Sequence, residues 1–177
     1  MKIIIASDIH GSAYWCKKLT EAFEKEGGDM LILLGDILYH GPRNPLPDEY
    51  SPKTVVELLA PLAGKIVCVR GNCESEVDQM VLPFNCSSDY AVVYADGVKL
   101  HLSHGHRPMP PMGRGDVYLT GHTHVPLNAL EECGCLHLNP GSISLPKEGS
   151  RHGYIAFENG TFNFKDFDGA VYDQAKA

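Results

Sequence analysis

Three features are missing from the 177-residue sequence: a long apolar run, a cluster of basic residues and a regular framework of cysteines. A membrane-spanning helix needs roughly 20 consecutive apolar residues, and a secretion signal needs a shorter apolar core behind a basic start. The N-terminal segment MKIIIASDIH instead enters a strand pattern at once. We therefore expect a cytoplasmic protein that has no membrane partner.

The six cysteines, at positions 16, 68, 73, 86, 133 and 135, do not have the spacing of a disulfide framework. Cys133-Gly-Cys135 lacks the companion pair of a zinc ribbon and is typical of a turn that leads into a strand. In a reducing compartment we expect free and mostly buried thiols.

The charge of the chain limits its partners. The net charge is −7 and Lys and Arg form no block, so a long nucleic acid would meet no broad basic surface. The sequence also has no stripe of aromatic and basic residues that would bind a single strand. Bound cations would offset the negative charge locally, so a small anionic substrate is compatible with this composition.

The first half of the chain alternates between strand and helix patterns. Apolar runs at 2–7, 30–34 and 65–70 predict three buried strands. Ser12 and Ser51-Pro52 stand where helices begin, and glycines follow where each helix should end. This alternation predicts parallel strands joined by right-handed crossovers.

After about residue 88 the patterns are mostly those of strands. Ala95-Asp96-Gly97 and Asn159-Gly160 predict two hairpins, and strand patterns at 116–120 and 135–139 lie between them. No composition shift separates the two halves, so we predict a single domain over 1–177. Its class is α/β (α+β), with two mixed sheets packed face to face and helices outside.

Side chains of the kind that bind metals follow five of these apolar runs. They come directly after KIIIAS, MLILLG, KIVCVRG, KLHLS and DVYLTG, and they are Asp8, His10, Asp36, Asn72, His104, His122 and His124. Because α/β folds gather functional groups at strand ends, we expect these side chains to meet. Seven oxygen and nitrogen ligands are too many for one transition metal and suit two metals that share a carboxylate.

Taken one at a time, these residues are weak indicators. A histidine pair at a strand end is more often a surface or core feature than a metal site, and Gly-Asp and Gly-Asn pairs are common turns. The joint order DxH, GD, GN, H and GHxH, each after a strand pattern, is hard to obtain by structural accident. We interpret His101, His137 and His152, which lie in or beside strands, as structural.

Five strings resemble the signature of the calcineurin-like metallophosphoesterases: Asp8-Ile9-His10, Gly35-Asp36, Gly71-Asn72, His104-Gly105-His106 and Gly121-His122-Thr123-His124. Segments 36–44, 70–78 and 139–142 are also similar to small bacterial phosphodiesterases of the YfcE type. The resemblance spans nearly the whole chain. It implies a four-layer αββα sandwich and hydrolysis of a phosphoester by attack of a metal-activated hydroxide.

The resemblance also implies how the ligands divide. One metal would be held by Asp8, His10 and His124, the other by Asn72, His104 and His122, and Asp36 would bridge them. This set of carboxylate, imidazole and amide ligands favours two divalent transition-metal ions, with Mn as the first choice and Fe, Zn, Co or Ni as alternatives.

One position departs from the family pattern. Many members carry a histidine directly after Gly-Asn that protonates the leaving oxygen, and this chain has Cys73 there. A thiol is a poor proton donor to an alkoxide, so we expect substrates with acidic leaving groups, such as aryl esters. His106 and His40 are candidates to replace that donor or to contact phosphate, and Arg43 is a candidate phosphate contact. Solvated loop roles are about as well supported for all three.

The leading hypothesis is a dinuclear-metal-dependent phosphodiesterase that acts on a small phosphodiester. A phosphomonoesterase of the same fold is one alternative, which the missing general-acid histidine disfavours. A non-catalytic protein-binding scaffold resembling the retromer subunit of this fold is another, although all seven ligand positions here keep metal-competent side chains. A metal-dependent nuclease is disfavoured by the acidic charge. A homodimer or higher homo-oligomer is expected from base rates.

Overall fold

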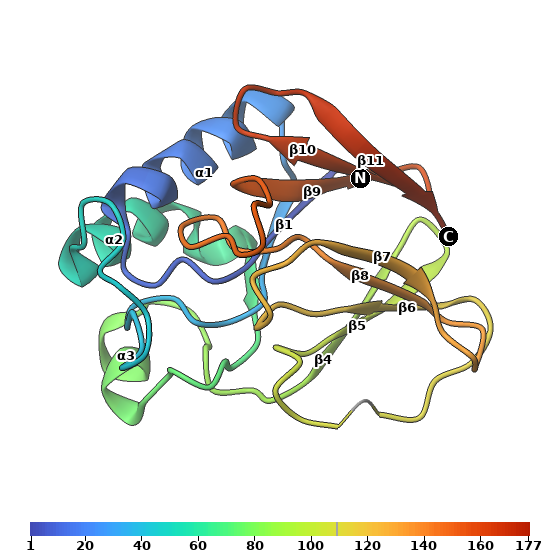
Figure 1. Cartoon of the computed structure of the whole chain (residues 1–177), viewed down its shortest axis with the longest axis horizontal. Helices are drawn as coiled ribbons and strands as arrows, with labels where there is room; N and C mark the ends of the chain where they lie inside the picture. Colours follow the sequence, from blue (N-terminus) through green and yellow to red (C-terminus); the bar gives the residue numbers. More distant parts are fainter. Residues whose placement is uncertain (109) are drawn as a thin grey trace.

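The computed structural model describes residues 1–108 and 110–177, which form two mixed β-sheets packed face to face (Figure 1). From edge to edge, the six-stranded sheet contains β11 (Val171–Lys176), β10 (Thr161–Asp166), β9 (Gly153–Glu158), β1 (Ile3–Ala6), β2 (Met30–Leu33) and β3 (Ile66–Cys68). The five-stranded sheet contains β4 (Ala91–Ala95), β5 (Val98–Leu102), β6 (Asp116–Leu119), β8 (Leu136–Asn139) and β7 (Leu127–Leu130).

The helices follow the local signals of the sequence. Helix α1 (Ala13–Glu26) begins where the Ser12 side chain accepts a hydrogen bond from the Trp15 backbone N–H at 3.2 Å, and it ends at Gly27 in the left-handed conformation. Helix α2 (Pro52–Leu59) follows Ser51 and continues as the 3₁₀-helix η1 (Ala60–Lys65). A short helix α3 (Glu76–Val81) was not predicted.

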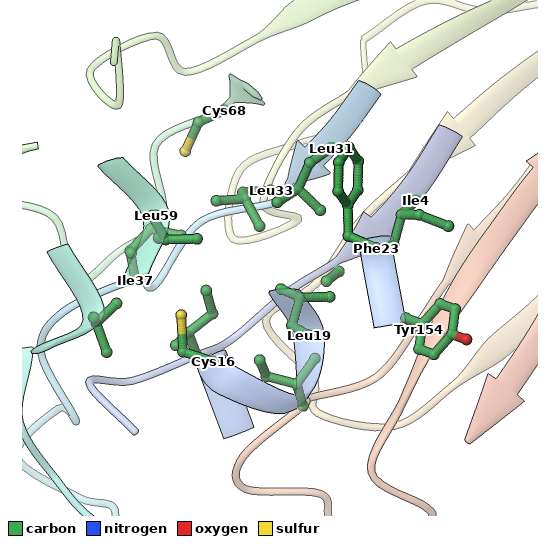
Figure 2. Packing of buried hydrophobic residues seen from close by; sticks show 14 of the residues in the cluster. Ile4, Cys16, Leu19, Phe23, Leu31, Leu33, Ile37, Leu59, Cys68 and Tyr154 are labelled. Atoms are coloured by element: carbon green, nitrogen blue, oxygen red, sulfur yellow. The ribbon is translucent and has the colours of Figure 1, made fainter. Parts of the chain in front are cut away.

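Strand β1 contributes to two hydrophobic cores because successive side chains of a strand point to opposite faces. Ile4 packs with α1 residues such as Leu19 and Phe23 in the core between the helices and the six-stranded sheet (Figure 2). Ile3 and Ile5 belong to the core between the two sheets. A strand buried on both faces needs a continuous apolar sequence, which explains the unbroken run in 2–7.

The two mixed sheets, packed face to face with helices outside, agree with the sequence-based prediction. Strands β1, β2 and β3 are parallel, and the two predicted hairpins are β4–β5 and β9–β10. The two longer helices, α1 and α2, lie on the outer face of the six-stranded sheet. Within the described residues neither of them covers the other sheet, where His101 and Tyr118 are buried without a helix above them.

The predicted thiol chemistry also agrees: all six cysteines are free, and four of them are buried. Cys133 and Cys135 lie in the turn between β7 and β8, as expected. In the part of the chain that the structure describes, no helix combines the length and the apolar character needed to cross a bilayer.

Candidate metal centre

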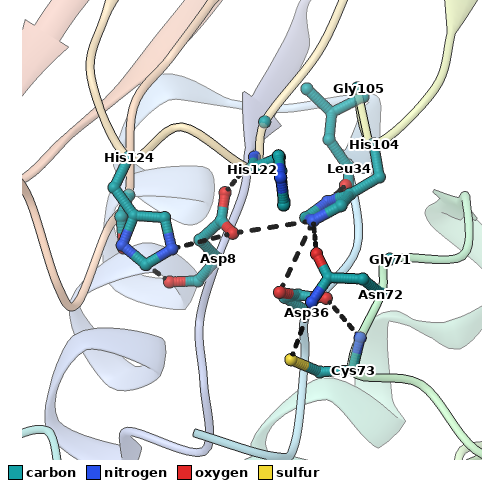
Figure 3. Close-up of polar contacts among 12 residues, drawn as sticks. Asp8, Leu34, Asp36, Gly71, Asn72, Cys73, His104, Gly105, His122 and His124 are labelled. Atoms are coloured by element: carbon teal, nitrogen blue, oxygen red, sulfur yellow. Dashed lines mark hydrogen bonds and ion pairs between the residues drawn. The ribbon is translucent and has the colours of Figure 1, made fainter. Parts of the chain in front are cut away.

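The structure brings all seven candidate ligands together (Figure 3 labels six of them). Each one follows the carboxyl end of β1, β2, β3, β5 or β6. Strands β1, β2 and β3 run parallel in one sheet and β5 and β6 run parallel in the other, so within each sheet the ends lie at the same edge. The packing of the two sheets then places both sets of residues around one point.

Five of these seven residues have a left-handed backbone: Asp8 (φ 57°), His10 (φ 50°), Asp36 (φ 56°), His122 (φ 68°) and His124 (φ 63°). This conformation costs a residue with a Cβ about 1–2 kcal/mol. Such strain persists only where the surrounding structure holds it, and it gathers at functional sites. The clustering therefore indicates that the fold is arranged to direct these side chains inward.

The deepest part of the cluster contains Asp8, His10 and His124, which are 0%, 1% and 3% exposed. Oδ1 of Asp8 lies 3.3 Å from Nε2 of His124 and 3.5 Å from Nε2 of His10. The two Nε2 atoms are 3.1 Å apart. We call these three residues the deep triad.

Backbone carbonyl groups orient the imidazoles of this cluster. Nδ1 of His10 lies 2.8 Å from the Tyr39 carbonyl oxygen, and Nδ1 of His124 lies 2.7 Å from that of Leu145. A carbonyl oxygen only accepts, so each Nδ1 carries a proton and each neutral ring presents a bare lone pair at Nε2. Carbonyl or carboxylate partners of this kind usually accompany metal-binding histidines.

Two bare lone pairs 3.1 Å apart repel each other unless a proton or a metal ion lies beside both. Oδ1 of Asp8 is also buried and accepts no hydrogen bond from the described residues. A buried carboxylate oxygen without a hydrogen-bond partner is costly, and a divalent cation would satisfy it. The donor set of the deep triad therefore fits a metal ion.

Asp36 lies between this triad and the remaining ligands. Its Oδ2 is 3.7 Å from Nε2 of His10 and 3.4 Å from Nε2 of His104, and its Oδ1 accepts a hydrogen bond from the Cys73 backbone N–H at 2.9 Å. One carboxylate thus reaches imidazoles on both sides. This is the position that a bridging ligand requires.

The other side of the cluster contains Asn72, His104 and His122, which we call the shallow triad. His104 is buried, and its Nδ1 faces the Leu34 carbonyl oxygen at 2.6 Å. Its Nε2 lies 3.1 Å from Oδ1 of Asn72, and its ring centroid lies 5.1 Å from that of His122. Asn72 is exposed and His122 half-buried, so this triad opens towards solvent.

The charged groups of the cluster shift one another's pKa values. Burial alone would raise the pKa of Asp8, but the neighbouring His10 and His124 imidazoles hold it well below its usual range. Burial would lower the pKa of His104, but the carboxylates of Asp36 and Asp8 raise it to about 9. Without a metal, protons on the imidazoles therefore supply the positive charge that these carboxylates need.

Glu74 is a site residue that the sequence did not reveal. It is 6% exposed and accepts hydrogen bonds from the backbone N–H of Asp36 at 2.9 Å, of Ile37 at 2.7 Å and of Gly71. Burial and the nearby Asp36 raise the pKa of Glu74 to about 7. One carboxyl group thus ties together the loops that carry Asp36 and Asn72. Its sequence context, a polar loop, gave no sign of this role.

Gly71 illustrates why a glycine precedes several of the ligands. A Cβ atom at this position would lie only 2.6 Å from the backbone nitrogen of Asp36, a distance that real Cβ atoms do not adopt. Glycine therefore permits the close approach of the two loops.

A cavity of about 310 Å³, which we call the metal pocket, is lined by four of the candidate ligands: Asn72 and His122 of the shallow triad, His124 of the deep triad and Asp36. Arg43, the candidate phosphate contact from the sequence, lines it, and so does Lys147, which the sequence did not suggest. His40 and His106 belong to the described residues but not to this lining. His106 lies beside the rings of His104 and His122, and the ring of His40 lies between two tyrosines.

Cys73 also lines the metal pocket, close to the ligand groups. Its Sγ accepts a hydrogen bond from Nδ2 of Asn72 at 3.3 Å and lies within 4.8 Å of ligand atoms of His10 and Asp36. Burial and then the negative charge of Asp36 raise the pKa of the thiol. The group is therefore a protonated thiol rather than a reactive thiolate in the metal-free protein.

Comparisons with known proteins agree with this geometry. The family described as the calcineurin-like phosphoesterase superfamily domain matches residues 1–161. Phosphodiesterase YfcE of Escherichia coli is 43% identical over 163 residues, which cover 90% of this chain and 88% of YfcE. The solved structure of the E. coli phosphoesterase Yfce aligns with a TM-score of 0.95 and 40% identity over 99% of both chains.

More distant structures share the fold alone. Vacuolar protein sorting 29 from Cryptosporidium parvum aligns with a TM-score of 0.65 over 99% of this chain and 98% of its own, but only 18% of the residues are identical. The family match, by contrast, covers most of the sequence, and the similarity to YfcE extends over nearly all of it. This chain belongs to the calcineurin-like phosphoesterase superfamily.

Proposed function

We propose that the protein is a dinuclear-metal-dependent phosphodiesterase that hydrolyses a small phosphodiester. The observation that carries the proposal is the convergence of imidazole lone pairs and carboxylate oxygens beside an open cavity. Asp8, His10 and His124 would hold one ion, and Asn72, His104 and His122 the other, with Asp36 shared. The name of the relative YfcE, a phosphodiesterase at 43% identity, supports the choice of reaction.

The two ions, when bound, would lower the pKa of a coordinated water from 15.7 towards ~7 and neutralise charge on the phosphate. Mn is the first choice, and the same donor set also suits Fe, Zn, Co or Ni.

The protein's own residues orient the substrate in this mechanism. Arg43 and Lys147 line the metal pocket and take part in none of the ion pairs found among the described residues, so both cations are available to the phosphate oxygens. Asp36 and Glu74 hold the surrounding loops through backbone N–H groups.

The leaving group limits the choice of substrate. Cys73 occupies the place of the usual general acid, and its raised pKa keeps the proton on sulfur. Such a thiol transfers its proton poorly to an alkoxide, whereas an aryl oxide leaves without protonation. A diester with an acidic leaving group is therefore the substrate class that the site suits best. The single-domain organisation, the location in the cell and the homo-oligomeric state stay predictions.

The test is a substrate panel run on metal-free protein supplied with Mn, Ni, Co, Zn or Mg. We expect no hydrolysis without metal, restoration by Mn, and faster turnover of a bis-aryl phosphate than of the aryl monoester. A strong preference for alkyl monoesters, such as sugar phosphates, would favour the phosphomonoesterase alternative. Tight metal binding without hydrolysis of any ester would favour the binding scaffold.

A further inference from the structure

A second cavity, of about 620 Å³, adjoins the metal pocket. Pro42, Arg43, Asn72 and Cys73 line both spaces, so the two are continuous at that border. Away from the border, the walls of the second cavity come from Tyr39 and from the start of α3 (Ser75, Val77 and Asp78). We call this space the side cavity.

The two spaces differ in charge. The metal pocket is lined by Arg43, Lys147 and four of the candidate ligands, which together suit an anionic phosphate. In the side cavity, by contrast, Arg43 at the border is balanced by Asp78, whose carboxylate accepts a hydrogen bond from the Ser75 backbone N–H at 2.9 Å. Tyr39, Pro42 and Val77 add apolar surface to a wall that also carries the uncharged polar groups of Asn72 and Ser75. A phosphate should therefore occupy the first space and an uncharged group the second.

The ring of Tyr39 is held in place at this wall. It packs edge-on against His40 (centroids 4.8 Å apart), which packs edge-on against Tyr50 (5.2 Å). The backbone oxygen of Tyr39 also faces Nδ1 of His10, which ties the residue to the deep triad. Yet the residue is 42% exposed, so ring surface remains free. A positioned aromatic ring is a stacking surface for another planar ring.

We infer that the side cavity binds an aromatic ester group of the substrate, an aryl ring or a nucleobase, while the phosphate lies in the metal pocket. This inference rests on the proposed function, because it assigns a place to one ester group of the phosphodiester. It gives Tyr39 a role in specificity: the ring stacks on the ester group. Preformed stacking lowers the entropic cost of ordering that group.

Equilibrium binding to the metal-loaded protein tests the inference without relying on turnover. Adenosine monophosphate, ribose phosphate and inorganic phosphate serve as probes, measured by titration calorimetry. We expect Tyr39→Ala to weaken adenosine monophosphate binding about tenfold, while binding of the two probes without a ring changes less than twofold. Tyr39→Phe should bind like the wild type because the ring is kept. Tyr14→Ala, at a comparably exposed tyrosine on α1 (39%), is the matched control.

A second pair of variants probes another residue of the wall. Val77 is 62% exposed, so Val77→Asp should fold normally while placing a negative charge in the side cavity. It should weaken adenosine monophosphate binding about tenfold, whereas Val171→Asp, at a 53% exposed position of β11, should have no effect. Circular dichroism checks the fold of each variant.

The outcomes separate the two proposals. The side-cavity inference would be overturned if the wild type, Tyr39→Ala and Val77→Asp bound adenosine monophosphate equally well. The phosphodiesterase proposal would still stand in that case, provided that the wild type hydrolyses diesters. Failure of the wild type to hydrolyse any diester with any metal would refute the proposed function. Ring-dependent binding in that case would still support the side cavity as a site for aromatic phosphates.

Discussion

The deep and shallow triads of the candidate metal centre are built differently. The deep triad is at most 3% exposed, and both of its imidazoles face backbone carbonyl oxygens. In the shallow triad only the His104 ring has such a partner among the described residues, and Asn72 and His122 are more exposed than any residue of the deep triad. The fold therefore organises one half of the site before any ligand arrives, and leaves the other half open to solvent.

This difference has a thermodynamic consequence. Ligands whose rotamers are locked by hydrogen bonds lose less entropy when they bind an ion, and loss of such partners typically reduces metal affinity 10–100-fold. The deep triad should hold its ion tightly and the shallow triad more weakly. The ion held by the shallow triad, on the solvent side, would then be the one that contacts the substrate and exchanges with solution.

The change expected to do most is Asp36→Asn, because it removes the negative charge of the carboxylate that lies between the two triads, 3.7 Å from His10 and 3.4 Å from His104. We expect kcat for an aryl diester to fall about 10³-fold or more, since charge on the ions and on the phosphate is no longer balanced. Plasma mass spectrometry should detect loss of metal in parallel. Asp168→Asn, at an exposed carboxylate, is the control. A variant with both ions and near-native turnover would show that Asp36 does not bridge.

Removing one histidine from each triad sharpens the comparison. His10→Ala should abolish the tighter of two metal-binding steps in a calorimetric titration, and His122→Ala should abolish the weaker one. The two steps should differ about 10–100-fold in dissociation constant. His137→Ala, on the outer face of the five-stranded sheet, should keep both steps. Loss of the same step in the His10 and His122 variants would mean that the triads do not form separate sites.

A smaller effect is expected at Cys73, on the border of the shallow triad. Cys73→His should increase activity towards esters with poor leaving groups about tenfold. Well-placed general acids contribute 10²–10⁴-fold, and we expect a smaller gain because the new imidazole is not aligned for proton transfer by the rest of the site. Aryl diesters should change little in this variant and in Cys73→Ala. Complete loss of activity in Cys73→Ala, with metal content and fold intact, would identify the thiol as a nucleophile or ligand.

The central strands could be predicted because burial on both faces demands unbroken apolar sequence, as in β1 and β2. Strands β7 and β11 could not, because they lie at sheet edges and most of their side chains are exposed. Helix α3 has six residues and no buried side chain, so it left no periodic pattern. Nor did the sequence indicate that β9 would pair with β1, because a hairpin signal predicts only that its own two strands pair with each other.

The ligand cluster could be predicted because each residue follows a strand, and parallel strands bring their ends together. Glu74 could not, because its role depends on three backbone N–H groups that only the folded loops place around it. Lys147 is similar: it reaches the metal pocket because its backbone N–H donates to the His124 carbonyl oxygen at 3.1 Å. A charged residue in a loop has no sequence signature that separates such a role from simple solvation.

The last expected effect concerns pH and stability, and it distinguishes the metal-free from the metal-loaded centre. In the metal-free protein the pKa of His104 rises from 6.5 to about 9 because of Asp36 and Asp8. A group whose pKa is higher in the folded state stabilises the fold fully below its unfolded pKa, and that contribution is lost as pH rises through the folded value. The metal-free protein should therefore lose about 1–3 kcal/mol between pH 6.5 and 9.

In the metal-loaded protein the ions replace these protons, so the same pH interval should leave its stability nearly constant while metal affinity rises with pH. Thermal melts in the presence and absence of chelator measure the difference, with an expected fall in Tm of about 2–4 °C for each kcal/mol in a chain of this size. His104→Gln should reduce the pH-dependent fall of the metal-free protein, because one titrating group is gone, while His10, whose pKa Asp8 raises against the effect of burial, remains. A metal-free Tm that stays level or rises across this interval would show that the carboxylates of the cluster do not hold a proton on His104.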